Sequence, residues 1–210
     1  MNKGICMLGA GGHGKVVLSS MSAAGMKVET ILDDDPHILG SEIGGIRVDG
    51  PIDDAHTEMI LAAVAAVGDN EARKRLVERL HGVNWIRVVH PWSYVHPSVR
   101  IGEGTVIFAG AVIQPDVSIG RHCIINTGST IDHDSVLGDY VHLAPGVNLA
   151  GNVCLQDGVF LGIGSVVIIG RSVGRWTTVG AGGVVRTDLP PHAVAMGVPA
   201  RVKKYKGISL

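Results

Sequence analysis

Aliphatic residues recur at every sixth position through the second half of this chain. From Val95 to Val185, all sixteen positions at this spacing, since (185 − 95)/6 + 1 = 16, hold Val, Ile or Leu. Only roughly three residues in ten of the chain are of these types, so chance does not explain the run. A strict short period predicts stacked repeats, each of which buries its aliphatic anchor against the neighbouring repeats.

The residues beside these anchors are mostly small. The position two before the anchor holds Thr105, Ala111, Cys123, Ser129, Ser135, Ser165, Thr177 and Gly183, and the position after it holds Gly102, Gly120, Gly138, Gly162, Gly174 and Gly180. We expect the aliphatic side chains to point inward, the small residues to fit the corners, and the glycines to permit tight turns.

The first part of the chain alternates between two other patterns. Apolar runs predict strands and amphipathic runs predict helices, with strands over 3–8, 28–32, 59–67 and 85–89 and helices over 15–24 and 71–80. This alternation predicts a small Rossmann-like parallel sheet over residues 1–84, with ligands at the carboxyl ends of its strands. The repeat domain, with a C-terminal cap, is expected over residues 85–210.

Composition narrows the classes of protein. The 18 Lys and Arg residues nearly balance the 19 Asp and Glu residues, which argues against nucleic acid or an anionic membrane as partner. Mean hydropathy is high at +0.31, yet no apolar run has the 18 or more residues of a membrane helix, so we expect no membrane insertion. The chain start lacks a secretion-signal pattern, and the three cysteines are odd in number. We therefore expect a cytoplasmic protein with buried, reduced thiols.

A glycine-rich turn lies between the first predicted strand and helix. Residues Gly9–Gly14 fit the spacing G-x-G-x-x-G, in which backbone N–H groups approach a pyrophosphate at a helix N-terminus. Asp33 and Asp34 follow about 20 residues later, where an acidic residue can meet a ribose; the alternative is a solvated turn before Pro36. The domain is short for a complete dinucleotide fold, so a mononucleotide or nucleotide-sugar is favoured over NAD.

The repeat also contains a polar segment that its core does not require. His133 lies between Asp132 and Asp134, two positions after an anchor, and His142 follows just before another anchor. An adjacent carboxylate can orient an imidazole, as a general base for an amine or hydroxyl nucleophile requires. The alternatives are that both histidines are surface turn residues, or that they join His122 and Cys123 at zinc, although their spacing matches no standard metal motif.

Taken together, these motifs resemble a known family. They are similar to those of the hexapeptide-repeat acetyltransferases that include sialic acid O-acetyltransferases and nucleotide-aminosugar N-acetyltransferases. The segments that carry the resemblance are Gly9–Val16, Val67–Asn70, His90-Pro91, Asn126-Thr127, Asp132–Asp134, Ala150–Asn152 and Gly197–Ala200. The resemblance implies a left-handed parallel β-helix in the second domain, a homotrimer, and acetyl-CoA bound between neighbouring β-helices.

The resemblance also implies roles for individual residues. His133 would be the general base, and Asp134, where some members have Glu, would orient it. His142, Gly151, Gly162, Ile163 and Ala181 would bind acetyl-CoA. Gly11, His13, Asp33, Asp34 and Asn70 would contact the nucleotide-sugar. The reaction would need neither a metal ion nor an acyl-enzyme.

Four functions are compared. The favoured one is an acetyl-CoA-dependent N-acetyltransferase acting on a nucleotide-linked amino-sugar, such as a UDP-4-amino-4,6-dideoxy-hexose, in bacterial glycan biosynthesis. The second is an O-acetyltransferase of sialic acid or a related sugar. The third is a non-catalytic trimer that binds a nucleotide-sugar, and an NAD-dependent oxidoreductase has only the glycine turn to support it.

Overall fold

The computed structural model describes residues 4–53, 60 and 62–207. The chain divides into two compact units, Met1–Pro91 and Trp92–Leu210. The sequence placed a boundary after residue 84, but β6 at Asn84–Trp85 pairs with a strand of the first sheet, so the first unit extends further.

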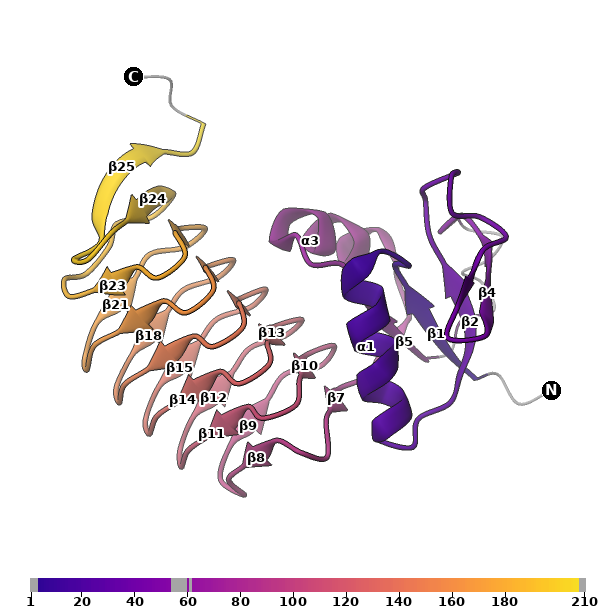
Figure 1. The fold of residues 1–210 in the computed structure, drawn as a ribbon, viewed down its shortest axis with the longest axis horizontal. Helices are drawn as coiled ribbons and strands as arrows, with labels where there is room; N and C mark the ends of the chain where they lie inside the picture. The colour runs from indigo at the N-terminus through magenta and orange to yellow at the C-terminus, as the bar shows by residue number, and fades with distance from the viewer. Residues whose placement is uncertain (1–3, 54–59, 61, 208–210) are drawn as a thin grey trace. The chain divides into compact units, whose positions relative to one another are not determined.

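The first unit contains a mainly parallel sheet with strand order β3-β4-β2-β1-β5-β6 (Figure 1). Among the described strands of this sheet, only β3 is antiparallel, where it pairs with β4. The elements are β1 Ile5–Leu8, α1 Gly12–Ala23, β2 Val28–Leu32, β3 Glu42–Ile43, β4 Ile46–Gly50, β5 Ala62–Ala65, α3 Asn70–Arg79 and β6 Asn84–Trp85; β7 Val88–Val89 follows and is not a strand of this sheet. This arrangement confirms the predicted Rossmann-like α/β fold.

The element boundaries differ from the sequence prediction in three places. Helix α1 begins at Gly12, inside the predicted turn. The sequence did not predict this first helical turn because glycine has a low helix propensity. The strand predicted over 85–89 is two short strands, β6 and β7. The hairpin β3–β4 was missed, although its Gly44-Gly45 turn, with φ of 57° and 79°, carries a recognisable signal. Lys3, Met59 and Leu61 of the predicted strands lie outside the described residues.

One face of this sheet encloses an apolar core with α3. Its buried members include Leu8 and Leu32 from the strands, Leu76 and Leu80 from α3 and its end, and Cys6. Burial raises the pKa of the Cys6 thiol to about 12, so this thiol is held in its unreactive protonated form. Cys6, Cys123 and Cys154 are all free thiols; the first two are buried and Cys154 is partly buried.

The second unit is a parallel β-helix in which every predicted anchor ends a strand. From Ile107 to Val185 the anchors are at most 3 % exposed, whereas Val95 and Ile101 in the first turn are partly exposed. The strands are β8 Tyr94–Val95, β9 Arg100–Ile101, β10 Val106–Ile107, β11 Val112–Ile113, β12 Ser118–Ile119, β13 Ile124–Ile125, β14 Thr130–Ile131, β15 Val136–Leu137, β16 His142–Leu143, β17 Asn148–Leu149, β18 Cys154–Leu155, β19 Phe160–Leu161, β20 Val166–Val167, β21 Ser172–Val173, β22 Thr178–Val179, β23 Val184–Val185, β24 Ala193–Met196 and β25 Arg201–Tyr205.

Three faces make up this β-helix. From β8 to β20, each strand pairs in parallel with the strand eighteen residues later, as Val106 does with Ile124, since 124 − 106 = 18. The faces contain β10-β13-β16-β19-β22, β8-β11-β14-β17-β20-β23 and β9-β12-β15-β18-β21, and their stacked turns are visible in Figure 1. The predicted left-handed parallel β-helix is therefore the fold of this unit. At its end, β24 continues the first face in parallel and β25 returns antiparallel to it.

The corners correct the role expected for the glycines after each anchor. The left-handed backbone conformation falls instead three residues after the anchor, at every sixth position from Gly104 (φ 67°) to Gly182 (φ 63°). Where glycine follows the anchor, it is needed because successive turns approach closely at that position. A Cβ built on Gly120 would lie 2.5 Å from the carbonyl carbon of Gly138.

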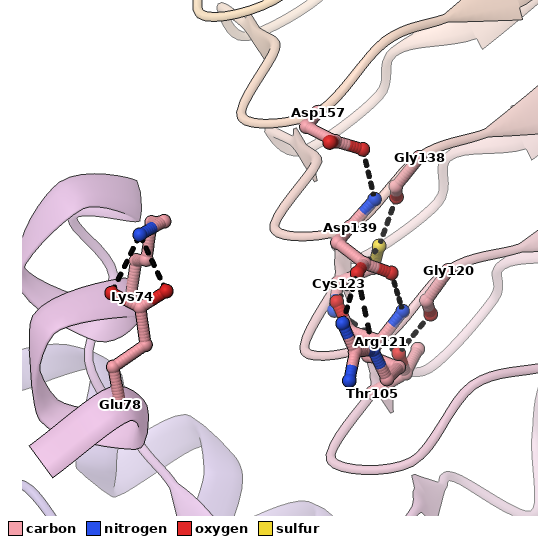
Figure 2. A network of polar contacts seen from close by, with 9 residues as sticks. All are labelled: Lys74, Glu78, Thr105, Gly120, Arg121, Cys123, Gly138, Asp139 and Asp157. Atoms are coloured by element: carbon pink, nitrogen blue, oxygen red, sulfur yellow. Dashed lines mark hydrogen bonds and ion pairs between the residues drawn. The ribbon is translucent and has the colours of Figure 1, made fainter.

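Side-chain hydrogen bonds connect the turns at one corner (Figure 2). Thr105 Oγ1 donates to the Gly120 carbonyl at 2.9 Å and accepts from the Cys123 N–H at 3.0 Å. Asp139 accepts from the Arg121 N–H at 2.7 Å and pairs with its guanidinium, while Asp157 accepts from the Asp139 N–H at 2.8 Å. The small and acidic residues of the corner thus satisfy backbone groups between turns.

Candidate functional site

A cavity of about 750 Å³ lies in the first unit, at the carboxyl ends of β1, β2 and β5. Gly11, His13, Asp33 and Asp34 line it, so four of the five residues predicted to contact a nucleotide-sugar lie around one cavity. Asn70 does not line the cavity. Its Oδ1 instead accepts a hydrogen bond at 2.9 Å from the buried Arg73 guanidinium.

The glycine turn leaves one side of this cavity open. A Cβ on Gly14 would lie 2.5 Å from the Gly9 carbonyl oxygen, and Gly9 itself has a φ of 113°. A Cβ on Gly11 or Gly12, by contrast, would meet nothing within 4 Å. No side chain caps α1, and its first turn carries no acidic residue. The outer glycines therefore serve packing, and the middle pair keeps space beside a helix N-terminus that favours anions.

Asp33 and Asp34 hold the loops around the cavity. Asp33 accepts hydrogen bonds from the Ala10 N–H at 2.6 Å and from the Asp35 N–H at 2.8 Å. Asp34 accepts from the Ile52 N–H at 2.8 Å and pairs with Arg79 at 3.1 Å. Both carboxylates thus shape the site through the chain's own backbone.

His13 has a neutral side chain at pH 7. Burial lowers the pKa of its imidazole to about 4, and the neighbouring positive charge of Arg73 acts in the same direction. Arg73 is itself 1 % exposed and donates to the Val67 carbonyl at 2.9 Å and the Gly68 carbonyl at 3.2 Å. The loop between β5 and α3 lies against His13, since a Cβ on Gly68 would be 3.6 Å from the His13 Cβ.

His133 lies in the corner between β14 and β15 and is half exposed. Its Nδ1–H donates to Asp134 Oδ2 at 2.8 Å, so the shorter aspartate arm reaches the imidazole. Its backbone N–H donates to Asp132 Oδ1 at 2.8 Å. The Asp134 hydrogen bond raises the pKa of His133 above its usual value, and Nε2 remains as the proton acceptor of the neutral ring.

Gly151 lies one turn further along the same corner. A Cβ at this position would come within 2.7 Å of His133 Nε2. Because Gly151 has no side chain, the His133 imidazole can pack directly against its backbone, so the two residues are neighbours in space.

His142 is in β16 and is only 8 % exposed, although it is off the anchor register. Its Nε2 lies 3.4 Å from Asn126 Nδ2, and its ring contacts Phe160 edge-on at 5.1 Å between centroids. The sequence did not single out Phe160. The eighteen-residue register places it directly beside His142, so that spacing is the signal that identifies it.

The remaining predicted acetyl-CoA residues lie on a different corner, between β19 and β20 and one turn beyond. A Cβ on Gly162 would lie 2.7 Å from the Ala181 nitrogen, and Ile163 is 58 % exposed. The left-handed position of this corner is glycine in every turn, at Gly110, Gly128, Gly146, Gly164 and Gly182. One chain therefore does not bring the whole predicted acetyl-CoA set to His133, because a face of the β-helix separates the two corners.

In residues 4–53, 60 and 62–207, no group of three or more His, Cys, Asp or Glu side chains is placed to hold a metal ion. No helix within the same ranges is long and apolar enough to cross a membrane.

A glycine-loop α/β unit followed by a hexapeptide β-helix defines a class of bacterial transferases. The family model described as the PglD N-terminal domain matches residues 4–80, and the bacterial transferase hexapeptide model matches residues 98–133. The chain is 42 % identical to PerB from Caulobacter crescentus, solved with CoA and GDP-perosamine, with a TM-score of 0.90 over 96 % of this chain and 97 % of that one.

Two further proteins are similar to this chain. The acetyltransferase domain of PglB from Neisseria gonorrhoeae, solved with acetyl coenzyme A, is 33 % identical with a TM-score of 0.88 over 96 % of this chain and all of that chain. UDP-N-acetylbacillosamine N-acetyltransferase of Bacillus subtilis is 42 % identical over 51 % of this chain and 52 % of its own length. The chain belongs to the hexapeptide-repeat nucleotide-aminosugar N-acetyltransferase family. It spans about half or less of the length of the curated relatives it matches.

Proposed function

We propose that this protein transfers an acetyl group from acetyl-CoA to the amine of a nucleotide-linked amino-sugar. The observation that carries the proposal is the His133–Asp134 pair, a half-exposed imidazole whose Nδ1 is held at 2.8 Å and whose Nε2 is available to a substrate. The cavity of the first unit supplies a place for a nucleotide, and the relatives solved with CoA support the acyl donor.

The chemistry follows from the state of His133. Neutral Nε2 accepts a proton from the sugar amine as its nitrogen attacks the thioester carbonyl carbon. A C–N bond forms, the C–S bond breaks, and the CoA thiolate leaves and takes up a proton. Asp134 stabilises the imidazolium that His133 becomes. Orientation of both substrates in one ternary complex supplies the remaining rate enhancement.

The pantetheine arm of acetyl-CoA is assigned to the all-glycine corner, with Gly162, Ile163 and Ala181. The open space beside these glycines accommodates an extended chain, and exposed Ile163 offers it an apolar contact. Because His133 and Gly151 lie on another corner, we assign the complete site to the interface of a homotrimer, where one copy's His133 faces the next copy's glycine corner. His142 is then a candidate to hydrogen-bond the thioester end.

The acceptor is assigned as a nucleoside-diphosphate amino-sugar in bacterial glycan biosynthesis. Relatives act on or bind UDP-, GDP- and dTDP-linked sugars by name, so the UDP-4-amino-4,6-dideoxy-hexose predicted from sequence is one member of the panel to test. The free thiols are consistent with action in the cytoplasm.

The test measures release of CoA thiol with amino-sugar nucleotides of all three kinds and with free sialic acids. Turnover with an amine acceptor supports the proposal, and turnover with hydroxyl acceptors alone supports the O-acetyltransferase instead. His133→Ala should lower kcat by about 10²- to 10⁴-fold. The matched control is His96→Ala, which removes another imidazole from the same edge of the β-helix, one that bonds only locally with Ser98 at 2.9 Å. Equal activity of the two variants would show that His133 is not the base, whereas no CoA release by wild-type protein with any acceptor would leave the non-catalytic binding protein.

A further inference from the structure

One face of α3 lines the cavity of the first unit. Its four lining residues follow the three- and four-residue spacing of a single helical face: Ala72, Arg75, Leu76 and Arg79. Leu76 is 8 % exposed and belongs to the core, so the cavity side of this face consists mainly of two guanidinium groups.

The two arginines differ in what already binds them. Arg79 pairs with Asp34 at 3.1 Å and donates to the Ile52 carbonyl at 2.8 Å, so it is used in holding the cavity wall. Arg75 has neither an ion pair nor a side-chain hydrogen bond with any residue in the described part of the chain. It is the cation of the cavity that is available to a ligand.

The other charges of the cavity do not neutralise Arg75. Both Asp33 and Asp34 accept hydrogen bonds from the backbone, and Asp34 already has Arg79 as its counter-ion. The glycine turn adds the positive end of α1, with no acidic residue in its first turn. The two aspartates and two arginines of the lining balance in formal charge, so Arg75 and the N-terminus of α1 are the groups that attract the negative charges of a ligand.

We propose that Arg75 binds the diphosphate of the sugar nucleotide and makes this cavity selective for nucleoside diphosphates over nucleosides. This inference rests on the proposed function. A guanidinium binds phosphate oxygens through two parallel hydrogen bonds, and these charge-assisted bonds are stronger than neutral ones. The base contributes comparatively little charge discrimination, so the selectivity resides in this contact and in the glycine turn.

The experiment compares Arg75→Gln with a neighbour of equal charge. Lys74→Gln removes one positive charge from the same helix, but Lys74 pairs with Glu78 one turn on and does not line the cavity (Figure 2). Calorimetric titration of each protein uses UDP, GDP and dTDP, followed by the monophosphate and the nucleoside of the base that wild-type protein binds most tightly. Thermal denaturation confirms that both variants remain folded.

We expect Arg75→Gln to weaken diphosphate binding by about 10- to 100-fold and nucleoside binding by less than about 2-fold. Lys74→Gln should change both by less than about 2-fold, and Arg75→Lys should fall between Arg75→Gln and wild type. Equal losses for the diphosphate and the nucleoside would assign Arg75 to the base and overturn the inference. So would equal behaviour of Arg75→Gln and Lys74→Gln. If wild-type protein binds none of the three diphosphates, the proposed function itself fails, independently of Arg75.

Discussion

Two histidines of this chain have their pKa values shifted in opposite directions by their surroundings. Asp134 raises the pKa of exposed His133 through a direct hydrogen bond, whereas burial lowers the pKa of His13 to about 4. His133 therefore binds a proton readily, as an acceptor of the amine proton must, and His13 stays uncharged beside a cavity that favours anions. The sequence identified both residues but not these opposite shifts, which depend on burial and on side-chain geometry.

Asp134→Asn should move the acid limb of the pH–rate profile to lower pH. Because His133 must be neutral to act as base, kcat/KM rises as pH increases through its pKa. The carboxylate raises that pKa, so removing its charge lowers it. We also expect the plateau to fall by about 10- to 100-fold, since the amide stabilises the imidazolium less. An unchanged acid limb, measured by CoA release across pH 5 to about 9, would remove His133 from the role of base.

His13→Asn should flatten the dependence of stability on pH in acid. Between about pH 6.5 and pH 4 the unfolded chain binds a proton at His13 and the folded protein does not. Wild-type protein therefore loses stability as pH falls through this window, by up to about 3 kcal/mol from this group. Chemical denaturation at several pH values measures the difference. A variant with the same slope as wild type would contradict the buried, neutral His13.

At the scale of the element, the six-residue repeat imposes a different physical demand at each position. The anchors must be aliphatic because they fill the interior, and the sequence alone predicted all sixteen of their strands. The sequence could not distinguish a glycine needed for close approach of two turns from a glycine needed for positive φ, because the residue type is the same in both cases. Short strands were also not predicted. β3 and β4 have too few residues for a clear hydrophobic period, and only the Gly44-Gly45 turn indicated a hairpin.

The two kinds of corner glycine should respond differently to substitution. Gly120→Ala places a Cβ against the next turn and should lower the free energy of unfolding of the β-helix by about 1–3 kcal/mol. Gly128→Asn should cost less, because a Cβ there meets nothing within 4 Å and Asn152 adopts φ 56° at the equivalent position. Denaturant unfolding of the two variants makes the comparison. Greater damage from Gly128→Asn would contradict this division of roles.

At the scale of the whole molecule, some of the predicted site residues lie close together and others do not. Gly11, His13, Asp33 and Asp34 surround one cavity because parallel strands end on the same sheet edge, which topology allowed the sequence to predict. Asn70 instead accepts a hydrogen bond from Arg73, and the spacing of residues in the sequence does not predict this contact. The acetyl-CoA residues fall on two corners of the β-helix, and this arrangement motivates the proposed trimeric site.

Mixed trimers test that site directly. His133→Ala removes the base, and Ala181→Trp fills the glycine corner at an exposed position; each should inactivate its own homotrimer. Unfolded together in equal amounts and refolded, the two variants should regain about one quarter of wild-type activity, because one interface in four joins two intact halves. Recovery measured by CoA release supports a shared site. No recovery, with mixed trimers shown by mass spectrometry, would place the site within one chain.

The reversal of direction at the end of the β-helix has a consequence for solubility. A stack of parallel strands exposes unpaired backbone groups at its last turn, and these offer a template on which another chain can polymerise. Here β25 covers β24 in the opposite direction and presents Arg201, Lys203 and Lys204 to solvent. A strand added at this edge would meet positively charged side chains and a strand that runs opposite to the others of the face. The hairpin thus disfavours the addition of another chain at the end of this face.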